Sequence, residues 1–177
     1  MTANDSTLIK SYLRGDRAAM QELYERHEQY WFRLCLRYGR SRSEAQDIMQ
    51  DALVQIFKSL KQFDSKKGSF SAWSNRIMVT TALQHFRKEK YRASEDLNTV
   101  LDDADTSADV FDRISAKELT QIIQQLPDGY RLVFNLYEIE GYKHQEIAEM
   151  LEISVGTSKS QLSKAKKMLR SQLEKIF

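Results

Sequence analysis

The fold is decided by the stretch HQEIAEMLEISVGTSKSQLSKAKKMLR at residues 144–170. Its first part predicts a short helix with Ile147, Ala148 and Leu151 on the inner face. A turn of three residues follows, and Ser154 is suited to cap a second helix because its hydroxyl can accept from a free amide. Small and apolar residues at helical spacing form the predicted inner face of that second helix: Val155, Ser158, Leu162, Ala165 and Leu169. This order of elements indicates a helix-turn-helix.

The second helix of the motif has a basic outer face. Between Ile153 and Leu173 the sequence holds five Lys and Arg residues and no acid. Phosphates attract such a face, and groups near the helix start can reach base edges in a major groove. A solvated terminal helix is the alternative interpretation, but the short helix, turn and cap before it favour DNA binding.

Composition and charge suggest two small helical domains. The chain of 177 residues has one proline, six glycines and 29% charged residues, which predicts a soluble, all-α protein. Residues 1–92 carry a net charge of +7, residues 93–118 of −6, and residues 119–177 of +1. The acidic middle segment predicts a flexible linker. An apolar membrane span, an export signal and a second cysteine beside Cys35 are absent from the sequence, so we expect a cytoplasmic protein.

The N-terminal part is predicted to form helices around a loop. Asp16 is suited to cap one helix, and Ser43 with Gln46 fits the capping box of the next. The inner face of that next helix is predicted to contain Ile48, Ala52, Leu53, Ile56, Phe57 and Leu60. A loop at 64–69 precedes a long helix, which ends in the basic residues Arg87, Lys88, Lys90 and Arg92.

Two surfaces of this N-terminal part have two interpretations each. Phe70 and Trp73 can stack unpaired bases beside basic residues, but large aromatic side chains are more often core, and spacing alone favours the core. The polar residues Gln46, Asp47, Gln50 and Asp51 share an outer helix face. They suit the start of a solvated helix, and they equally suit contact with a basic partner.

Signals for catalysis or metal binding are absent from the sequence. The three histidines are dispersed, and His27 lies on an apolar stripe, which favours packing over metal ligation. We find neither a glycine-rich phosphate loop nor a bracketed nucleophile. We therefore expect a protein that is not an enzyme and that needs no cofactor and no metal.

Five blocks in order resemble a known family. They are AQDIMQDALVQIF (45–57), FSAWSNRI (70–77), LPDGYRLVFNL (126–136), EGYKHQEIA (140–148) and ISVGTSKSQLSKAK (153–166). Together they are similar to bacterial RNA polymerase sigma factors of the extracytoplasmic-function (ECF, group IV) subfamily. The resemblance covers nearly all of the chain outside the acidic segment.

The resemblance implies region 2 at residues 1–92, a linker at 93–113 and region 4 at 114–177. It implies binding to core RNA polymerase, through the clamp helices of the largest subunit and the flap, and to promoter DNA. It also implies an anti-sigma factor as a further partner, and no membrane insertion. The polymerase-binding positions of region 2 match Gln46, Asp47, Gln50, Asp51, Leu53 and Phe57. Those for opening the −10 element and holding an unstacked base match the loop at Lys66–Ser71, which includes Ser69 and Phe70, followed by Trp73, Arg76 and Thr80. The resemblance places Arg87, Lys88 and Lys90 on backbone phosphates.

Region 4 would place its second helix in the major groove of the −35 element. The contacting positions match Thr157, Lys159, Ser160, Lys164 and Lys166. Lys143 stands where many relatives have a Ser or Thr that caps the first helix of the motif. Lysines replace common arginines at 159 and 164, and lysine lacks the planar fork that reads guanine in the −35 element. Thr80 stands where an asparagine is frequent, so the −10 sequence cannot be carried over. Two other interpretations stay open, an autonomous helix-turn-helix regulator that binds duplex DNA unaided and a helical adaptor with incidental basic faces.

Overall fold

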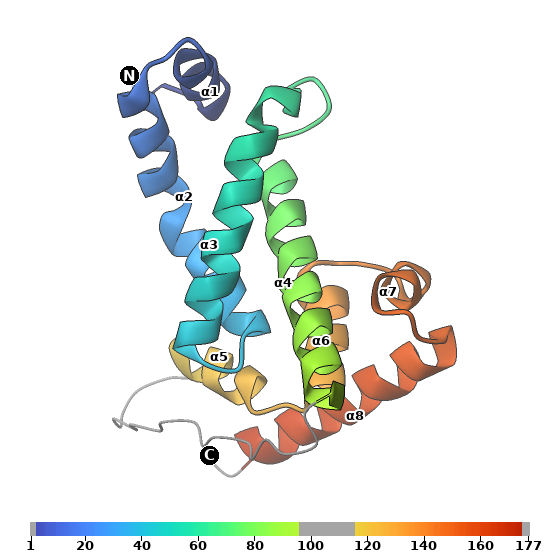
Figure 1. The fold of residues 1–177 in the computed structure, drawn as a ribbon. Coiled ribbons are helices and arrows are strands. Elements are labelled where there is room, and N and C mark those ends of the chain that lie inside the picture. Colours follow the sequence, from blue (N-terminus) through green and yellow to red (C-terminus); the bar gives the residue numbers. More distant parts are fainter. Residues whose placement is uncertain (1–2, 96–115, 175–177) are drawn as a thin grey trace. The chain divides into compact units, whose positions relative to one another are not determined.

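The computed structural model describes residues 3–95 and 116–174, and all regular elements in these ranges are helical (Figure 1). This confirms the predicted all-α class. Most of the predicted linker, from residue 96 to 113, lies outside the described residues. The chain divides into two compact units, the first formed by Met1–Cys35 with Ser43–Lys90 and the second by Leu36–Arg42 with Tyr91–Phe177.

The first unit begins with two capped helices. Helix α1 spans Asp5–Leu13, and the Asn4 side chain before it accepts from the Thr7 amide at 2.8 Å. Helix α2 spans Arg17–Tyr38, and the Asp16 carboxylate accepts from the Ala18 amide at 3.0 Å, which confirms the predicted cap. A short side chain that accepts from the first amides of a helix stabilises its start.

Helix α3 spans Arg42–Ser59 and is followed by a 3₁₀ turn, Leu60–Gln62. The predicted capping box at Ser43 is wrong, because the helix begins before it and Ser41 is the residue that precedes Arg42. The predicted inner positions Leu53 and Phe57 are only half-buried. The fully buried face of α3 consists of Ala45, Ile48, Met49, Ala52 and Ile56.

Helix α4 spans Phe70–Glu95 and completes the core of the first unit. The Trp31 indole of α2 donates to the buried Ser74 hydroxyl of α4 at 3.2 Å. Below it, the Cys35 thiol contacts the Met78 sulfur at 3.9 Å. These contacts fix the register of α2 against the second and third turns of α4.

The second unit contains α5 (Ala116–Gln124), α6 (Asp128–Phe134), a π-helical turn (Asn135–Ile139), α7 (His144–Leu151) and α8 (Val155–Leu173). Helix α8 packs against α5, α6 and α7. One buried cluster, formed by α5, the turn after it and α8, consists of Ile122, Ile123, Leu126, Ala165 and Leu169.

The α7–α8 pair is the predicted helix-turn-helix. Helix α7 ends at Glu152 in the left-handed region, with φ 56°, and the chain then turns into α8. The Ser154 hydroxyl accepts from the Thr157 amide at 2.9 Å, as predicted. One inner position is wrong, because Val155 is 37% exposed. Val155 occupies the first position of α8, before the helix has turned its inner face onto α7.

Candidate nucleic-acid interface

An aromatic cluster lies where α4 begins. The Phe70 ring is 2% exposed and meets Phe63 edge-on, with ring centroids 5.6 Å apart. Trp73 is half-buried, and its ring centroid lies 5.8 Å from that of Phe70 and 5.6 Å from that of Phe63. Trp31 approaches Phe70 edge-on at 6.2 Å. Phe70 is therefore core in this conformation, whereas part of the Trp73 ring reaches the surface.

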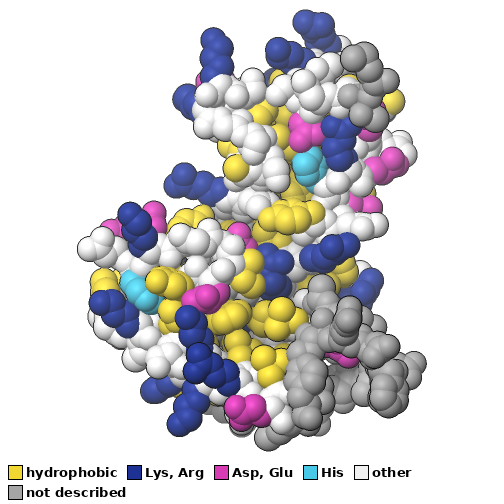
Figure 2. Space-filling view, turned by 180° about the vertical axis from the view of Figure 1, so that it is seen from behind, with side chains coloured by type: hydrophobic (Ala, Val, Ile, Leu, Met, Phe, Trp, Pro, Cys, Tyr) yellow, Lys and Arg dark blue, Asp and Glu magenta, His cyan; other side chains and the backbone are white. Residues whose placement is uncertain are grey.

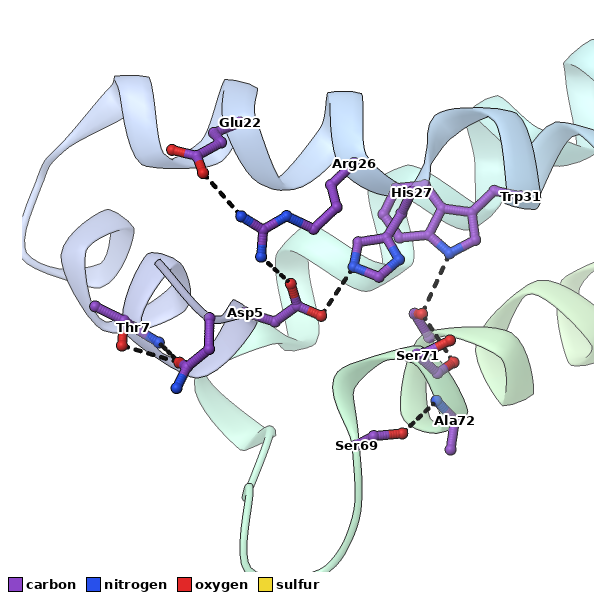
Figure 3. Close-up of polar contacts among 11 residues, drawn as sticks. Asp5, Thr7, Glu22, Arg26, His27, Trp31, Ser69, Ser71 and Ala72 are labelled. Carbon is purple, nitrogen blue, oxygen red and sulfur yellow. Dashed lines mark hydrogen bonds and ion pairs between the residues drawn. The ribbon is translucent and has the colours of Figure 1, made fainter. Parts of the chain in front are cut away.

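Hydrogen bonds fix the backbone around this cluster (Figure 3). The Ser69 hydroxyl accepts from the Ala72 amide at 3.2 Å and so caps α4. The Ser74 hydroxyl, which accepts from Trp31, donates in turn to the Ser71 carbonyl at 3.1 Å. Before the helix, the Asp64 carboxylate accepts from the Lys66 amide at 3.0 Å, a turn that shapes the loop. These bonds shape the turn at Asp64 and the start of α4, on either side of the exposed residues 65–69.

Most of the remaining region 2 candidates for DNA contact are exposed. They are Lys66, Ser69, Arg76, Thr80, Arg87 and Lys88. The Thr80 hydroxyl donates to the Arg76 carbonyl at 2.8 Å, so its donor serves its own helix. The side chain of Lys90 lies outside the described ones. The structure thus places the partly exposed Trp73 and several exposed cations on α4 and the loop before it.

The acidic face of α3 points to solvent. Gln46, Asp47, Gln50 and Asp51 are exposed, on the side opposite the buried face of the helix. Phe57 follows two turns later and meets the Tyr12 ring of α1 edge-on at 6.4 Å. A cavity of about 300 Å³ next to this pair is lined in part by Arg17, Lys58 and Lys61.

The outer face of α8 carries the region 4 candidates. Lys159, Ser160 and Lys164 are exposed, and Thr157 is half-buried with its hydroxyl 2.8 Å from that of Ser154. The Ser160 hydroxyl donates to the Thr157 carbonyl at 3.0 Å. Figure 2 shows Lys and Arg side chains projecting from the surface of this unit.

Two lysines of this face differ in their surroundings. The ammonium of Lys166 pairs with Glu138 at 2.7 Å, from the π-helical turn. The ammonium of Lys164 lies 6.0 Å from the centre of the Tyr130 ring. Since Glu138 partly neutralises one of the two, Lys164 offers the stronger attraction for a phosphate.

Contacts that sequence reasoning missed hold α8 in place. His144, at the start of α7, stacks on Tyr137 at 4.4 Å between ring centres. A ring nitrogen of His144 lies 2.9 Å from the hydroxyl of the buried Ser158. At the same helix start, the Glu146 carboxylate accepts from the Lys143 amide at 2.7 Å, which is the half of a capping box that does not need a hydroxyl at position 143.

A buried arginine organises the second unit. Arg131 is 2% exposed, and its guanidinium donates to the carbonyls of Tyr38 and Leu126, each at 3.1 Å. It also donates to the Asp128 carboxylate at 2.6 Å. A planar group with five donors can satisfy several carbonyls at once, which explains how this charge is tolerated inside. The only sequence signal was a charged residue inside an apolar pattern.

Among the described residues, Glu44 of α3 with His85 and Glu89 of α4 bring three potential metal-ligand atoms together. His85 Nε2 lies 3.7 Å from a Glu44 oxygen and 3.8 Å from a Glu89 oxygen, and the three ligand atoms lie within 4.8 Å of one another. The distances exceed those of hydrogen bonds and suit loose ion pairs when the imidazole is protonated.

Elsewhere in the first unit, burial raises the pKa of Tyr24, and the hydrogen bond and charge of Glu28 raise it further.

Comparison with known proteins identifies both units. The model of sigma-70 region 2 matches residues 23–92, and that of sigma-70 region 4 matches residues 116–169. Among curated proteins, the ECF sigma factor SigW of Bacillus subtilis is 29% identical over 180 residues, covering 95% of this chain and 96% of its own. The ECF sigma factor SigM of Mycobacterium tuberculosis is 28% identical over 166 residues, covering 94% and 83%.

A solved structure has the same fold. It is the sigma factor RpoE of Bartonella quintana in complex with the anti-sigma factor NepR, with a TM-score of 0.61 and 15% identity, covering 88% of this chain and 96% of its own. The two matched regions span well over half of the chain, and the chain belongs to the sigma-70 family. Within that family it is an ECF sigma factor, a protein that directs transcription initiation. Among the described residues, no helix is long and apolar enough to cross a membrane.

Proposed function

We propose that the two units recognise one promoter in two different ways while both are held on core RNA polymerase. The observation that carries this proposal is the contrast between their candidate DNA surfaces. The first unit has a half-buried indole beside a fixed loop and exposed cations, which suits unpaired bases. The second has a capped helix with exposed lysines, which suits the major groove of a duplex.

In region 4, we assign base readout to Lys159 and Ser160. Both are exposed in the second turn of α8, and the Ser160 hydroxyl keeps lone pairs that can accept from a base. The start of α8 around Thr157 is assigned to a phosphate, because helix N-termini favour anions. Lys164 and Lys166 contribute further phosphate contacts, the second one weakened by Glu138.

In region 2, we assign capture of an unpaired base to Trp73 and the loop from Lys66 to Ser71. Turning a base out of the duplex costs a few kcal/mol, and stacking returns about 1–3 kcal/mol per base. The balance favours opening only when the pocket is already formed. The buried Phe70 holds the Trp73 ring from beneath, and Arg76, Thr80, Arg87, Lys88 and Lys90 follow along α4 toward the DNA backbone.

The polymerase surface is proposed at Gln46, Asp47, Gln50 and Asp51, with Leu53 and Phe57 as half-buried support. Its exposure leaves it accessible to the clamp helices, and the flap is assigned to region 4. Neither unit alone has enough contacts for tight and selective binding. Mounting both on one enzyme makes the second contact intramolecular, so the two affinities combine through effective concentration.

The chain supplies recognition and no catalysis of its own, and it works in the cytoplasm, where core polymerase is. Its domain limits are residues 1–92 and 114–177, with 93–113 as the linker. The complex of the related fold with an anti-sigma factor supports an anti-sigma partner here as well.

The test is transcription in vitro with purified core polymerase on a library of promoters. We expect transcripts from a defined subset of the library only when both proteins are present. The same purified chain, without core polymerase, should bind those promoters only weakly. Tight and specific binding of the intact duplex by the free chain, without stimulation of core polymerase, would instead establish an autonomous regulator.

A further inference from the structure

Helix α1 precedes the region 2 match, which begins at residue 23, yet it contacts the interior beneath the candidate pocket. Leu8 and Ile9 of α1 are buried, at 5% and 3% exposure. In the first turn, the two carboxylate oxygens of Asp5 accept from α2, one from Arg26 at 2.8 Å and one from His27 Nε2 at 2.9 Å. Figure 3 shows Asp5 lying between these two side chains.

His27 connects this carboxylate to the aromatic cluster. Its side chain is only 11% exposed. The ring stacks on Trp31 with centroids 5.2 Å apart and planes 22° apart, and it meets Phe70 edge-on at 5.2 Å. A carboxylate only accepts, so Nε2 carries the proton in this contact. Asp5 therefore selects both the proton position and the rotation of a ring packed between two aromatic residues.

The contacts continue from this ring to the surface. Phe70 touches Trp73 at 5.8 Å with planes 31° apart, and Trp31 is fixed at its indole nitrogen by Ser74. A rotation of the His27 ring therefore changes the space available to Phe70, and Phe70 is what Trp73 rests on. Close-packed interiors transmit such displacements because they hold few voids.

We propose that Asp5 and His27 are positioning residues that hold the Trp73 ring ready for an unpaired base. This inference deepens the proposed function of region 2. Its test by DNA binding rests on that proposed function. Asp5 and His27 act through Phe70 and Trp31, so α1 becomes part of the −10 recognition machinery, although it lies before the matched region.

The first test needs no DNA. The chain has two tryptophans, so a ¹H–¹⁵N spectrum of the full chain contains two indole signals, and Trp73→Phe assigns them. Asp5→Ala should shift the Trp73 signal, and Asp5→Asn, which keeps an accepting oxygen for His27, should shift it less. The matched control is Glu22→Gln, because Glu22 pairs with Arg26 at 2.8 Å on the same surface without contacting His27. An unmoved Trp73 signal in Asp5→Ala overturns the proposal.

The second test uses holoenzyme and a labelled single-stranded oligonucleotide carrying the −10 sequence of a promoter selected from the library. Asp5→Ala should weaken its binding about tenfold, as expected for partial loss of one stacking contact. Core binding and binding to a −35 duplex should stay within twofold, and Asp5→Asn should recover most of the loss. If wild-type and Asp5→Ala holoenzyme bind the oligonucleotide equally well, the positioning role of Asp5 is overturned and the proposed function of the pocket stands.

The two tests separate this inference from the function on which it rests. If wild-type holoenzyme does not bind the oligonucleotide while Asp5→Ala still shifts Trp73, the DNA role of the pocket fails and the packing relay stands. His27→Gln gives an independent check, since it keeps a polar group but removes the ring between Trp31 and Phe70. His27→Gln should weaken oligonucleotide binding by holoenzyme at least as much as Asp5→Ala does. A smaller effect would contradict a relay through this ring.

Discussion

The start of α4 and the outer face of α8 are both assigned to DNA, but they relate differently to the core. On α8 the two roles fall on different residues, since Ser158 and Leu162 are buried while Lys159 and Ser160 between them are exposed. At the start of α4 the roles overlap. Phe70 is 2% exposed and Trp73, in contact with it, is half-buried.

This difference follows from what each surface must bind. A duplex presents its groove edges and phosphates to a protruding helix, so the reading side chains need only the backbone beneath them as support. An unpaired base needs a flat face and a formed pocket, and a formed pocket requires rings packed from below. Mutations should therefore separate stability from DNA binding on α8 and should damage both together at the start of α4.

The largest effect is expected for Phe70→Ala. Removing a buried ring that contacts Phe63, Trp31 and Trp73 should lower the free energy of unfolding by about 3–5 kcal/mol. Binding to the single-stranded −10 oligonucleotide should fall in the same variant. Urea unfolding measures the first effect, with Val54→Ala, an exposed position of α3, as a control that changes stability by about 0.5 kcal/mol or less.

A stability loss in Phe70→Ala without weaker oligonucleotide binding, measured where the variant is still folded, would separate the two roles at α4 and break the comparison. The converse result, weaker binding at unchanged stability, would mean that the Phe70 ring leaves the core to meet DNA.

The acidic face of α3 extends the comparison to a protein partner. Like the lysines of α8, Asp47 and Asp51 are exposed on a helix whose other face is buried. Replacing both by alanine should weaken core polymerase binding about tenfold or more, because each removes a charge from a proposed charged interface. Unfolding should be unchanged. Glu25→Ala, an exposed acid of α2, is the control, and wild-type affinity of the double variant for core would remove this surface from the proposal.

A smaller effect is expected at the cap of α8. Ser154→Ala removes the hydroxyl that accepts from the Thr157 amide and should cost about 1 kcal/mol of stability. The matched control is Ser160→Ala, whose exposed hydroxyl donates to a carbonyl already inside the helix. Thermal unfolding of the full chain distinguishes them, and equal losses in both variants would contradict the assignment of Ser154 as the cap.

Local patterns in the sequence predicted what depends on neighbouring residues. The Ser154 cap, the turn after α7 and the buried positions Leu162 and Ala165 all lie within one or two helical turns of the signals that predicted them. The errors are local too. Ser41 and Ser43 flank Arg42 and either could precede a helix, and the inner-face pattern was extended one residue too far at Val155.

The long-range contacts could not be predicted in this way. Asp5 and His27 are 22 residues apart, and Trp31 and Ser74 are 43 apart. Periodicity placed His27 on an apolar stripe, and the structure confirms that it is packed. A helical pattern, however, gives no register between two helices. The contact of the Asp5 carboxylate with the His27 ring therefore could not be predicted from it. Arg131 was missed for the same reason, because its partners include the distant Tyr38 carbonyl.

The smallest effect is expected at Lys164. It tests most directly whether DNA binding and stability fall on different residues of α8. Lys164→Ala should leave unfolding within about 0.5 kcal/mol of wild type and reduce the salt dependence of promoter binding by holoenzyme by about one unit of slope. Lys166→Ala should reduce the slope less, because Glu138 at 2.7 Å already shares that charge. Binding measured across a range of salt concentrations gives both slopes. Equal slopes for the two variants would mean that Glu138 releases Lys166 on DNA, and an unchanged slope in Lys164→Ala would remove its phosphate contact. In either case the phosphate contacts of α8 would have to be assigned differently from what the surroundings of Lys164 and Lys166 imply.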